Sequence, residues 1–236
     1  MPLVIGVGLL MFQQFNGGIA VIFNCAYIFS TAGFKNAKAV SVAVAAVQFG
    51  ANIFTCLIVD KLGRRILLLA SSVIMCLSQF SLGFYFELYL PLDTNGHQFN
   101  ASSLPSVFQS IAHTVPVDQL SWLAVTSLIV FNIFFGLAWG PLPWLVMSEI
   151  FPLRVRGPAS GAATLMALLC AFLVARTFPT LQEALTPQGT YWLYGIFCLL
   201  AFIFVYLVVP ETKGRTLEEI ENYFEKRGDT AYETIQ

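Results

Sequence analysis

Residues 38–90 read KAVSVAVAAVQFGANIFTCLIVDKLGRRILLLASSVIMCLSQFSLGFYFELYL, two apolar runs on either side of the charged hexapeptide DKLGRR at 60–65. Each run has the length of about 20 residues that a helix needs to cross a hydrocarbon core of about 30 Å. Six residues are too few for anything but a very short turn between them. This stretch therefore predicts two consecutive membrane spans.

The same pattern recurs along the chain. Hydrophobic residues make up 57% of the sequence and charged residues only 11%, which is far from the composition of a soluble domain. We predict an all-α membrane protein, a six-transmembrane-helix bundle over residues 1–209. Its spans are residues 3–30, 38–59, 66–90, 121–147, 158–180 and 189–209. A polar outer loop over 91–120 and a cytosolic tail over 210–236, with a short amphipathic helix, complete the predicted organisation.

The bulk numbers exclude several classes of function. The net charge of −1 offers no basic surface, so we expect a lipid bilayer and no nucleic acid as surroundings. The five cysteines fall in apolar runs without a CxxC pair, and we interpret them as buried thiols rather than a metal site or disulfides. We find no nucleophile–base pair, metal constellation or phosphate loop, and we therefore expect no enzyme, no metal and no cofactor.

Basic residues indicate how the spans are oriented, because they concentrate on the cytosolic side. One side carries Lys61, Arg64, Arg65, Arg154, Arg156, Lys213, Arg215, Lys226 and Arg227, and the other carries Lys35, Lys38 and Arg176. We expect both termini in the cytosol of a multi-pass protein, in the plasma membrane rather than an internal one. The sequon at Asn100 then faces away from the cytosol, where it is either glycosylated or a chance match.

Uncharged polar residues inside the spans mark either a solute path or a packing seam, because polar groups in hydrocarbon need partners. Gln13 and Gln14 lie in the first span, where Gly17 and Gly18 interrupt the helix. Amide groups both donate and accept, which suits neutral hydroxyl-rich solutes. For this pair we favour solute binding over interhelical packing.

In the second span, Gln48, Asn52 and Thr55 are spaced so that they share one helix face. Amide and hydroxyl side chains on such a face also hold spans together by hydrogen bonds. For Asn52 and Thr55 we favour this packing role over a place on the solute path.

The fourth span contains FFGLAWGPLPWLVMSEIF at 134–151. Pro141 and Pro143 lack a backbone donor and release the carbonyls four residues earlier, while Gly140 allows close helix approach. A helix broken at this depth is expected to bend around a site. Trp144 offers an indole face and one N–H donor, which fits a sugar ring. The alternative for Trp144 is an interfacial belt residue.

Charged residues gather at three successive cytosolic ends of the spans. They are Asp60, Arg64, Arg65, Glu149, Arg156, Glu211 and Arg215. Weak ion pairs of about 0–1 kcal/mol each can be made and broken, so we interpret the group as a reversible latch. The alternative is that cytosolic loops simply carry charge.

With these residues in place, the chain resembles the carboxy-terminal half of a major facilitator superfamily sugar porter, of the facilitated glucose or trehalose transporter type. The resemblance rests on four co-ordered motifs across about 215 residues: QQFNGG at 13–18, DKLGRR at 60–65, GPLPW with SEIFPLRVRG at 140–157, and PETKGRTLEEI at 210–220. It implies that the six spans are the seventh to twelfth of a twelve-span carrier, half of a major facilitator superfamily fold.

The resemblance also implies roles. Gln13, Gln14, Gln48 and Trp144 would face a sugar-binding cavity lined by Phe135, and the seven latch residues would close the cytosolic side. The sequence departs from the family's polar pattern at Ile19, Asn24, Gly136, Ala167 and Leu168.

The resemblance therefore predicts a facilitative hexose or trehalose carrier working by alternating access. It would take a small sugar as substrate and need an amino-terminal half or a second copy. The alternative is a truncated, non-transporting protein that associates with full-length porters.

Overall fold

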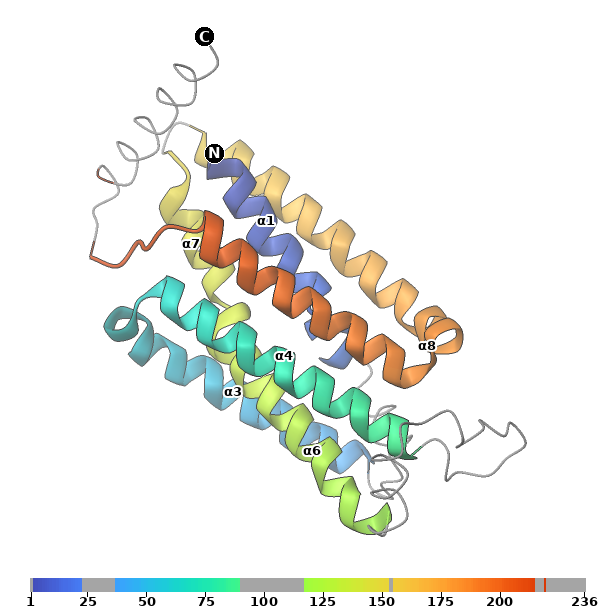
Figure 1. The fold of residues 1–236 in the computed structure, drawn as a ribbon. Coiled ribbons are helices and arrows are strands. Elements are labelled where there is room, and N and C mark those ends of the chain that lie inside the picture. The colour runs from blue at the N-terminus through green and yellow to red at the C-terminus, as the bar shows by residue number, and fades with distance from the viewer. Residues whose placement is uncertain (1, 23–36, 90–116, 153–154, 215–218, 220–236) are drawn as a thin grey trace.

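In a computed structural model of the chain, residues 2–22, 37–89, 117–152, 155–214 and 219 are described (Figure 1). Every assigned element in these ranges is helical. The elements are α1 (Pro2–Phe15), α3 (Ala37–Leu62), α4 (Arg64–Tyr89), α6 (Val117–Phe134), the π-helix η3 (Phe135–Trp139), α7 (Leu142–Ile150) and α8 (Arg156–Val208).

Five of the described helical stretches are long and apolar enough to cross a membrane, and the last of them accounts for two passes. Helix α8 has 53 residues. It would be about 80 Å long if straight, far more than a bilayer core requires. It reverses at Thr186, whose φ of 63° and ψ of 162° lie outside helical geometry, directly before Pro187. Figure 1 shows the two halves running back along each other. The predicted all-α membrane bundle is confirmed.

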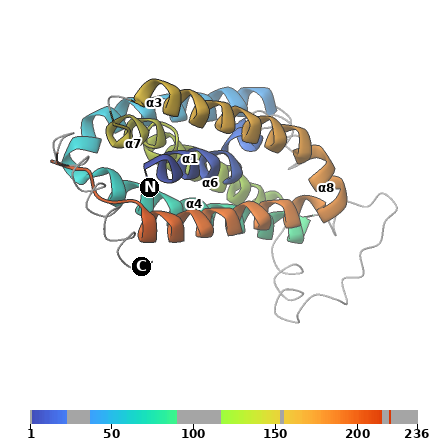
Figure 2. The ribbon, with the colours of Figure 1, turned by 90° about the horizontal axis from the view of Figure 1, so that it is seen from above.

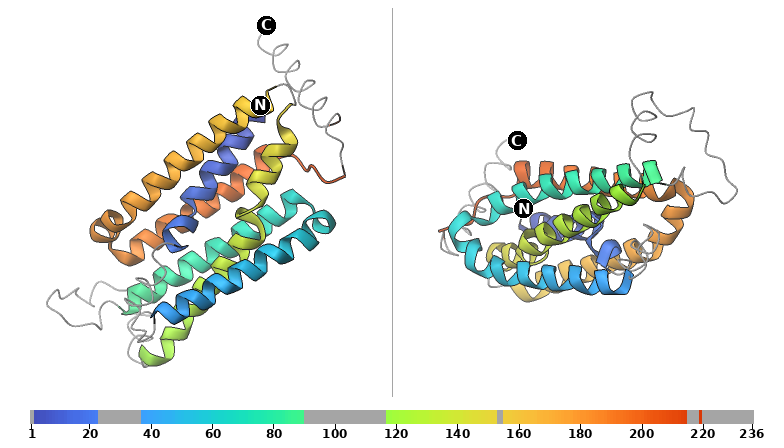
Figure 3. Two further views of the ribbon diagram at one scale, coloured as in Figure 1. Left: turned by 180° about the vertical axis from the view of Figure 1, so that it is seen from behind. Right: turned by 90° about the horizontal axis from the view of Figure 1, so that it is seen from below.

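The helices form three layers when the bundle is viewed along a perpendicular direction (Figure 2). Helix α3 and the first half of α8 make one outer layer, and α4 with the second half of α8 makes the other. Helices α1, α6 and α7 lie between them, as the opposite views of Figure 3 also show. The inner layer therefore has the least contact with lipid.

Large aromatic side chains fill the contact between α4, α8 and the inner layer. Phe86 of α4 stacks on Tyr191 of α8 with ring centroids 5.3 Å apart, and both are fully buried. Trp139 is also fully buried, and its Nε1 donates to Ser72 Oγ of α4 at 2.9 Å. The second half of α8, α4 and η3 are thus joined by close packing rather than by a solvent-filled gap.

The turn between the first two outer helices is shorter than the predicted hexapeptide. Helix α3 ends at Leu62 and α4 begins at Arg64, so Gly63 alone connects them. Its φ of +91° is a conformation that only glycine adopts without strain.

Some predicted features lie outside the described residues. These are residues 91–116 of the outer loop with Asn100, Asn24, the side chain of Asp60, Arg215, and most of the tail over 210–236. The last four residues of the predicted loop, 117–120, are instead the first turn of α6.

Candidate functional site

The first pass is interrupted at the place where the two glycines follow the glutamines. Helix α1 ends at Phe15, the chain turns through Asn16 and Gly17, and residues 18–22 are helical again. Gly17 has φ +86°, and a Cβ there would lie 2.8 Å from the ring of Tyr194. A side chain at this position would therefore meet both backbone strain and a buried aromatic ring.

The fourth pass is interrupted by a π-helical turn and the two prolines. The N–H of Gly140 donates to the carbonyl of Phe135, five residues back, at 2.6 Å. Thr55 Oγ1 of α3 lies 3.2 Å from the carbonyl oxygen of Gly136 and 2.9 Å from that of Leu137. The same hydroxyl lies 2.9 Å from the carbonyl oxygen of Ala51 in its own helix, so its single proton is shared between α3 and the break, where Pro141 cannot pair the carbonyl of Leu137. Thr55 has the packing role that its position predicted.

A hydrogen bond ties the two interrupted helices together. Gln13 Nε2 donates to the carbonyl of Gly140 at 2.7 Å. Gln13 and Gln14 are 6% and 7% exposed, and the Oε1 atom of each is buried without a hydrogen-bond partner among the described residues. Gln13 therefore combines a packing contact with a free acceptor, and both side-chain carbonyls can still accept a hydrogen bond.

A cavity of about 290 Å³ lies beside these two carbonyl groups. Residues from α1 and its continuation, η3, α7 and α8 line it: Gln13, Gln14, Ile19, Ile22, Phe135, Trp144, Ala167, Leu168 and Ala171. Four of the five predicted binding residues are among them. Gln48 is not, because it lies against η3, where a Cβ on Gly136 would meet Gln48 O at 3.1 Å and Gln48 Cγ at 3.3 Å.

The cavity joins hydrogen-bond acceptors to aromatic surface. Phe135 stacks on Phe131 with centroids 6.1 Å apart, and its ring occupies the space that a side chain on Gly18 would need, with a closest distance of 2.3 Å to that Cβ. Trp144 is 37% exposed. Amide oxygens accept from hydroxyl groups and aromatic faces stack on C–H groups, so the site can hold a small polyhydroxylated ring.

Ile22 and Ala171 were missed by the sequence analysis, because single aliphatic residues in an apolar span carry no signal. Ile19, Ala167 and Leu168, where the sequence departs from the family pattern, all line the cavity.

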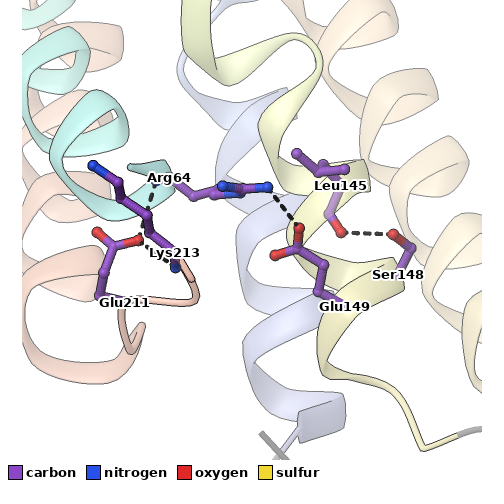
Figure 4. A network of polar contacts seen from close by, with 6 residues as sticks. All are labelled: Arg64, Leu145, Ser148, Glu149, Glu211 and Lys213. Carbon is purple, nitrogen blue, oxygen red and sulfur yellow. Dashed lines mark hydrogen bonds and ion pairs between the residues drawn. The ribbon is translucent and has the colours of Figure 1, made fainter. Parts of the chain in front are cut away.

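A second polar group lies at the end of the bundle where α4 begins (Figure 4). The Arg64 guanidinium lies 3.3 Å from Glu149 Oε1 of α7, and both side chains are mostly buried. The carboxylate of Glu211 accepts from the backbone N–H groups of Arg64 at 3.2 Å, Arg65 at 3.3 Å and Lys213 at 3.0 Å. Glu211 thus caps the start of α4, where a negative charge is favoured.

In the described part of the chain, the side chains of Arg65 and Arg156 form no ion pair with this group. Arg65 turns outward: its guanidinium donates to the carbonyl of Tyr206 at 2.6 Å and lies 5.9 Å from the centroid of that ring. The Nε of Arg156 is buried without a hydrogen-bond partner among the described residues. The structure brings Arg64, Glu149 and Glu211 together.

A membrane bundle whose interrupted helices line a cavity has the architecture of a solute carrier. The sequence profile of the family described as "Sugar (and other) transporter" matches residues 1–224. The chain therefore belongs to this family of membrane transporters.

Two groups of relatives are similar in sequence. "Solute carrier family 2, facilitated glucose transporter member 8" of Mus musculus is 44% identical over 96% of this chain and 46% of its own length. "Facilitated trehalose transporter Tret1" of Apis mellifera ligustica is 38% identical over 94% of this chain and 40% of its own length. The chain thus spans less than half the length of these relatives.

Solved structures of the xylose transporter XylE share the fold. The inward-open conformation of XylE from E. coli has a TM-score of 0.71 at 29% identity, covering 94% of this chain and 41% of that one. The proton:xylose symporter XylE bound to 6-bromo-6-deoxy-D-glucose has a TM-score of 0.72 at 30% identity, covering 94% and 42%. The fold is therefore half of a major facilitator superfamily bundle.

Proposed function

We propose that the chain forms the carboxy-terminal half of a facilitative carrier for a hexose or trehalose, which works by alternating access. The observation that carries this proposal is the cavity, in which the free, buried Oε1 atoms of Gln13 and Gln14 lie beside Phe135 and Trp144. Hydroxyl donors and a C–H face are what such a lining complements. Family membership supports the same substrate class.

The other half of the carrier is proposed to cover one open face of the bundle. Along α3 and the first half of α8, large apolar side chains are exposed, among them Phe49, Phe54, Leu165 and Phe172. Leu168, which lines the cavity, is also 62% exposed. An amino-terminal six-span half or a second copy that covers this face would enclose the substrate between two halves.

The group formed by Arg64, Glu149 and Glu211 is proposed as the cytosolic latch, with Arg156 as its fourth member.

Both termini would then be cytosolic in a plasma-membrane protein. An epitope tag at either terminus should react with antibody only after cells are permeabilised. The Asn100→Gln variant should lack a mass shift that glycosidase removes from the unmodified chain. Tag labelling on intact cells would reverse the orientation.

Uptake of labelled glucose and trehalose tests the carrier function. Cells that express the chain together with an amino-terminal half of a relative should take up one of these sugars above mock-transfected cells. Trp144→Ala should raise the sugar concentration at half-maximal uptake about tenfold, because it removes one stacking face that contributes about 1–1.5 kcal/mol. Trp122→Ala is the matched control, since Trp122 is 62% exposed and lies outside the cavity. No uptake at confirmed surface expression would contradict the proposal.

A second function is favoured by the open face: a non-transporting chain that associates with full-length porters. Such a chain would co-purify with a full-length relative from detergent extracts. Its association would be unchanged by Gln13→Ala and Trp144→Ala, since neither residue lies on the open face of α3. Loss of association in both variants would contradict this second function.

A further inference from the structure

The hydrogen-bonding side chains of the cavity lining come from α1 and α7. The glutamine pair projects from α1, and the indole N–H of Trp144 comes from α7. The lining contributed by α8 consists of Ala167, Leu168 and Ala171, and that of the α1 continuation consists of Ile19 and Ile22. These five side chains carry no donor or acceptor, so a ligand in the cavity meets amides where it faces Gln13 and Gln14 and hydrocarbon where it faces α8.

This division has a consequence for a fully hydroxylated ring. Its hydroxyl groups on the edge next to α1 can donate to the free Oε1 atoms. A hydroxyl group that points at the α8 wall finds no side-chain partner there, and wherever it gives up its water without gaining a partner the result is unfavourable. Replacing that hydroxyl by hydrogen, or capping it with a methyl group, removes the unpaired donor and adds apolar contact.

We propose that the cavity selects an amphipathic monosaccharide, a hexose in which one hydroxyl is absent or O-methylated, over the fully hydroxylated hexose. The apolar edge of this ligand lies against the α8 wall, and Leu168 is the residue that determines the preference. This inference rests on the proposed sugar-binding function and specifies its substrate class.

Ligand binding to the purified chain in lipid nanodiscs tests the proposal without requiring transport. Saturation-transfer NMR titrations would compare glucose with the monodeoxyglucoses and the mono-O-methylglucoses, one ring position at a time. We expect at least one ring position at which the derivative binds about fivefold more tightly than glucose, the size of effect expected for one unpaired hydroxyl at a partly open site. At that position, the deoxy or methyl protons should receive the strongest saturation.

Leu168→Asn supplies a hydrogen-bonding partner at the apolar wall and should reduce the preference to twofold or less. Ala171→Ser does the same with a smaller change in volume, and it tests the wall if the asparagine variant fails to insert. Leu165→Asn is the matched control: Leu165 is on the same helix with the same exposed fraction of 62%, but it does not line the cavity. It should keep the preference of the unmodified chain.

The outcomes separate the two proposals. If none of these sugars binds, the proposed sugar site is wrong and this inference is wrong with it. If sugars bind and glucose is the tightest at every ring position, the sugar site stands and the amphipathic preference is overturned. A preference that persists in both wall variants would show that the α8 wall does not determine it.

Discussion

Replacing Thr55 with valine should destabilise the bundle through the π-helical break rather than through lost packing. The Thr55 side chain is 3% exposed, and its hydroxyl is the side-chain donor on α3 that reaches Gly136 O and Leu137 O. Valine has nearly the same shape, so no cavity forms. The change removes the donor that α3 offers to the Leu137 carbonyl, whereas Ala51, the third carbonyl within reach of the hydroxyl, belongs to α3 itself.

The magnitude follows from that unpaired carbonyl. A buried acceptor without a partner costs about 1–3 kcal/mol, and hydrogen bonds between membrane helices contribute about 0.6–2 kcal/mol. We therefore expect Thr55→Val to lower the free energy of unfolding by about 1.5 kcal/mol. For a chain of this size that corresponds to a fall in melting temperature of about 3–6 °C.

Thermal unfolding in detergent, followed by size-exclusion of a fluorescent fusion, measures this shift. Thr177→Val is the control, because the exposed Thr177 hydroxyl donates only to carbonyls of its own helix, at Leu173 and Val174. Thr55→Ser keeps the hydroxyl and should retain more stability than the valine variant. Equal melting temperatures for Thr55→Val and Thr177→Val would refute the assignment of Thr55 as the donor for the break.

Two further variants test the site and the latch. Gly18→Ala should displace the ring of Phe135, which would lie 2.3 Å from the new Cβ, and should lower the free energy of unfolding by about 1–3 kcal/mol in the same melting assay. Gly161→Ala is the control: a Cβ there has no atom within 4 Å, so the change should be neutral or stabilising. Glu211→Ala should lower the free energy of unfolding by about 1–2 kcal/mol, because it leaves the first N–H groups of α4 uncapped. Hydrogen exchange of the amides at the start of α4 should become faster, and unchanged exchange there would contradict the capping role.

Span number and helix breaks could be predicted from the sequence because they depend on local composition. An apolar run of membrane length forms a span in any sequence context. Likewise, the glycine pair at Gly17 and the proline at Pro141 interrupt a helix through their own backbone chemistry. The π-helical turn over 135–139 could not be predicted, because it depends on which carbonyl the N–H of Gly140 selects. Thr55 of α3, which contacts the carbonyls of Gly136 and Leu137, is far from this turn in the sequence.

The site was predictable in its residue types and not in its pairings. Gln13 and Gly140 are 127 positions apart in the chain, and no local pattern announces a hydrogen bond between them. The displacement of Gln48 from the cavity has the same origin, since it follows from how closely α3 approaches η3. The sequence analysis assigned all seven charged residues to the latch, but the Arg65 guanidinium instead contacts the carbonyl and the ring of Tyr206 on α8.

The carboxylate of Glu211 follows the end of α8 in the chain and caps the start of α4, directly after the single glycine that ends α3. One side chain therefore fastens three helix termini at a single point, and aromatic stacking joins the far end of α4 to the start of the second half of α8. These outer helices act as a stiff frame. The two inner passes, each with a discontinuous backbone, are the compliant parts, so shape changes at the cavity are concentrated in them while the frame keeps its form.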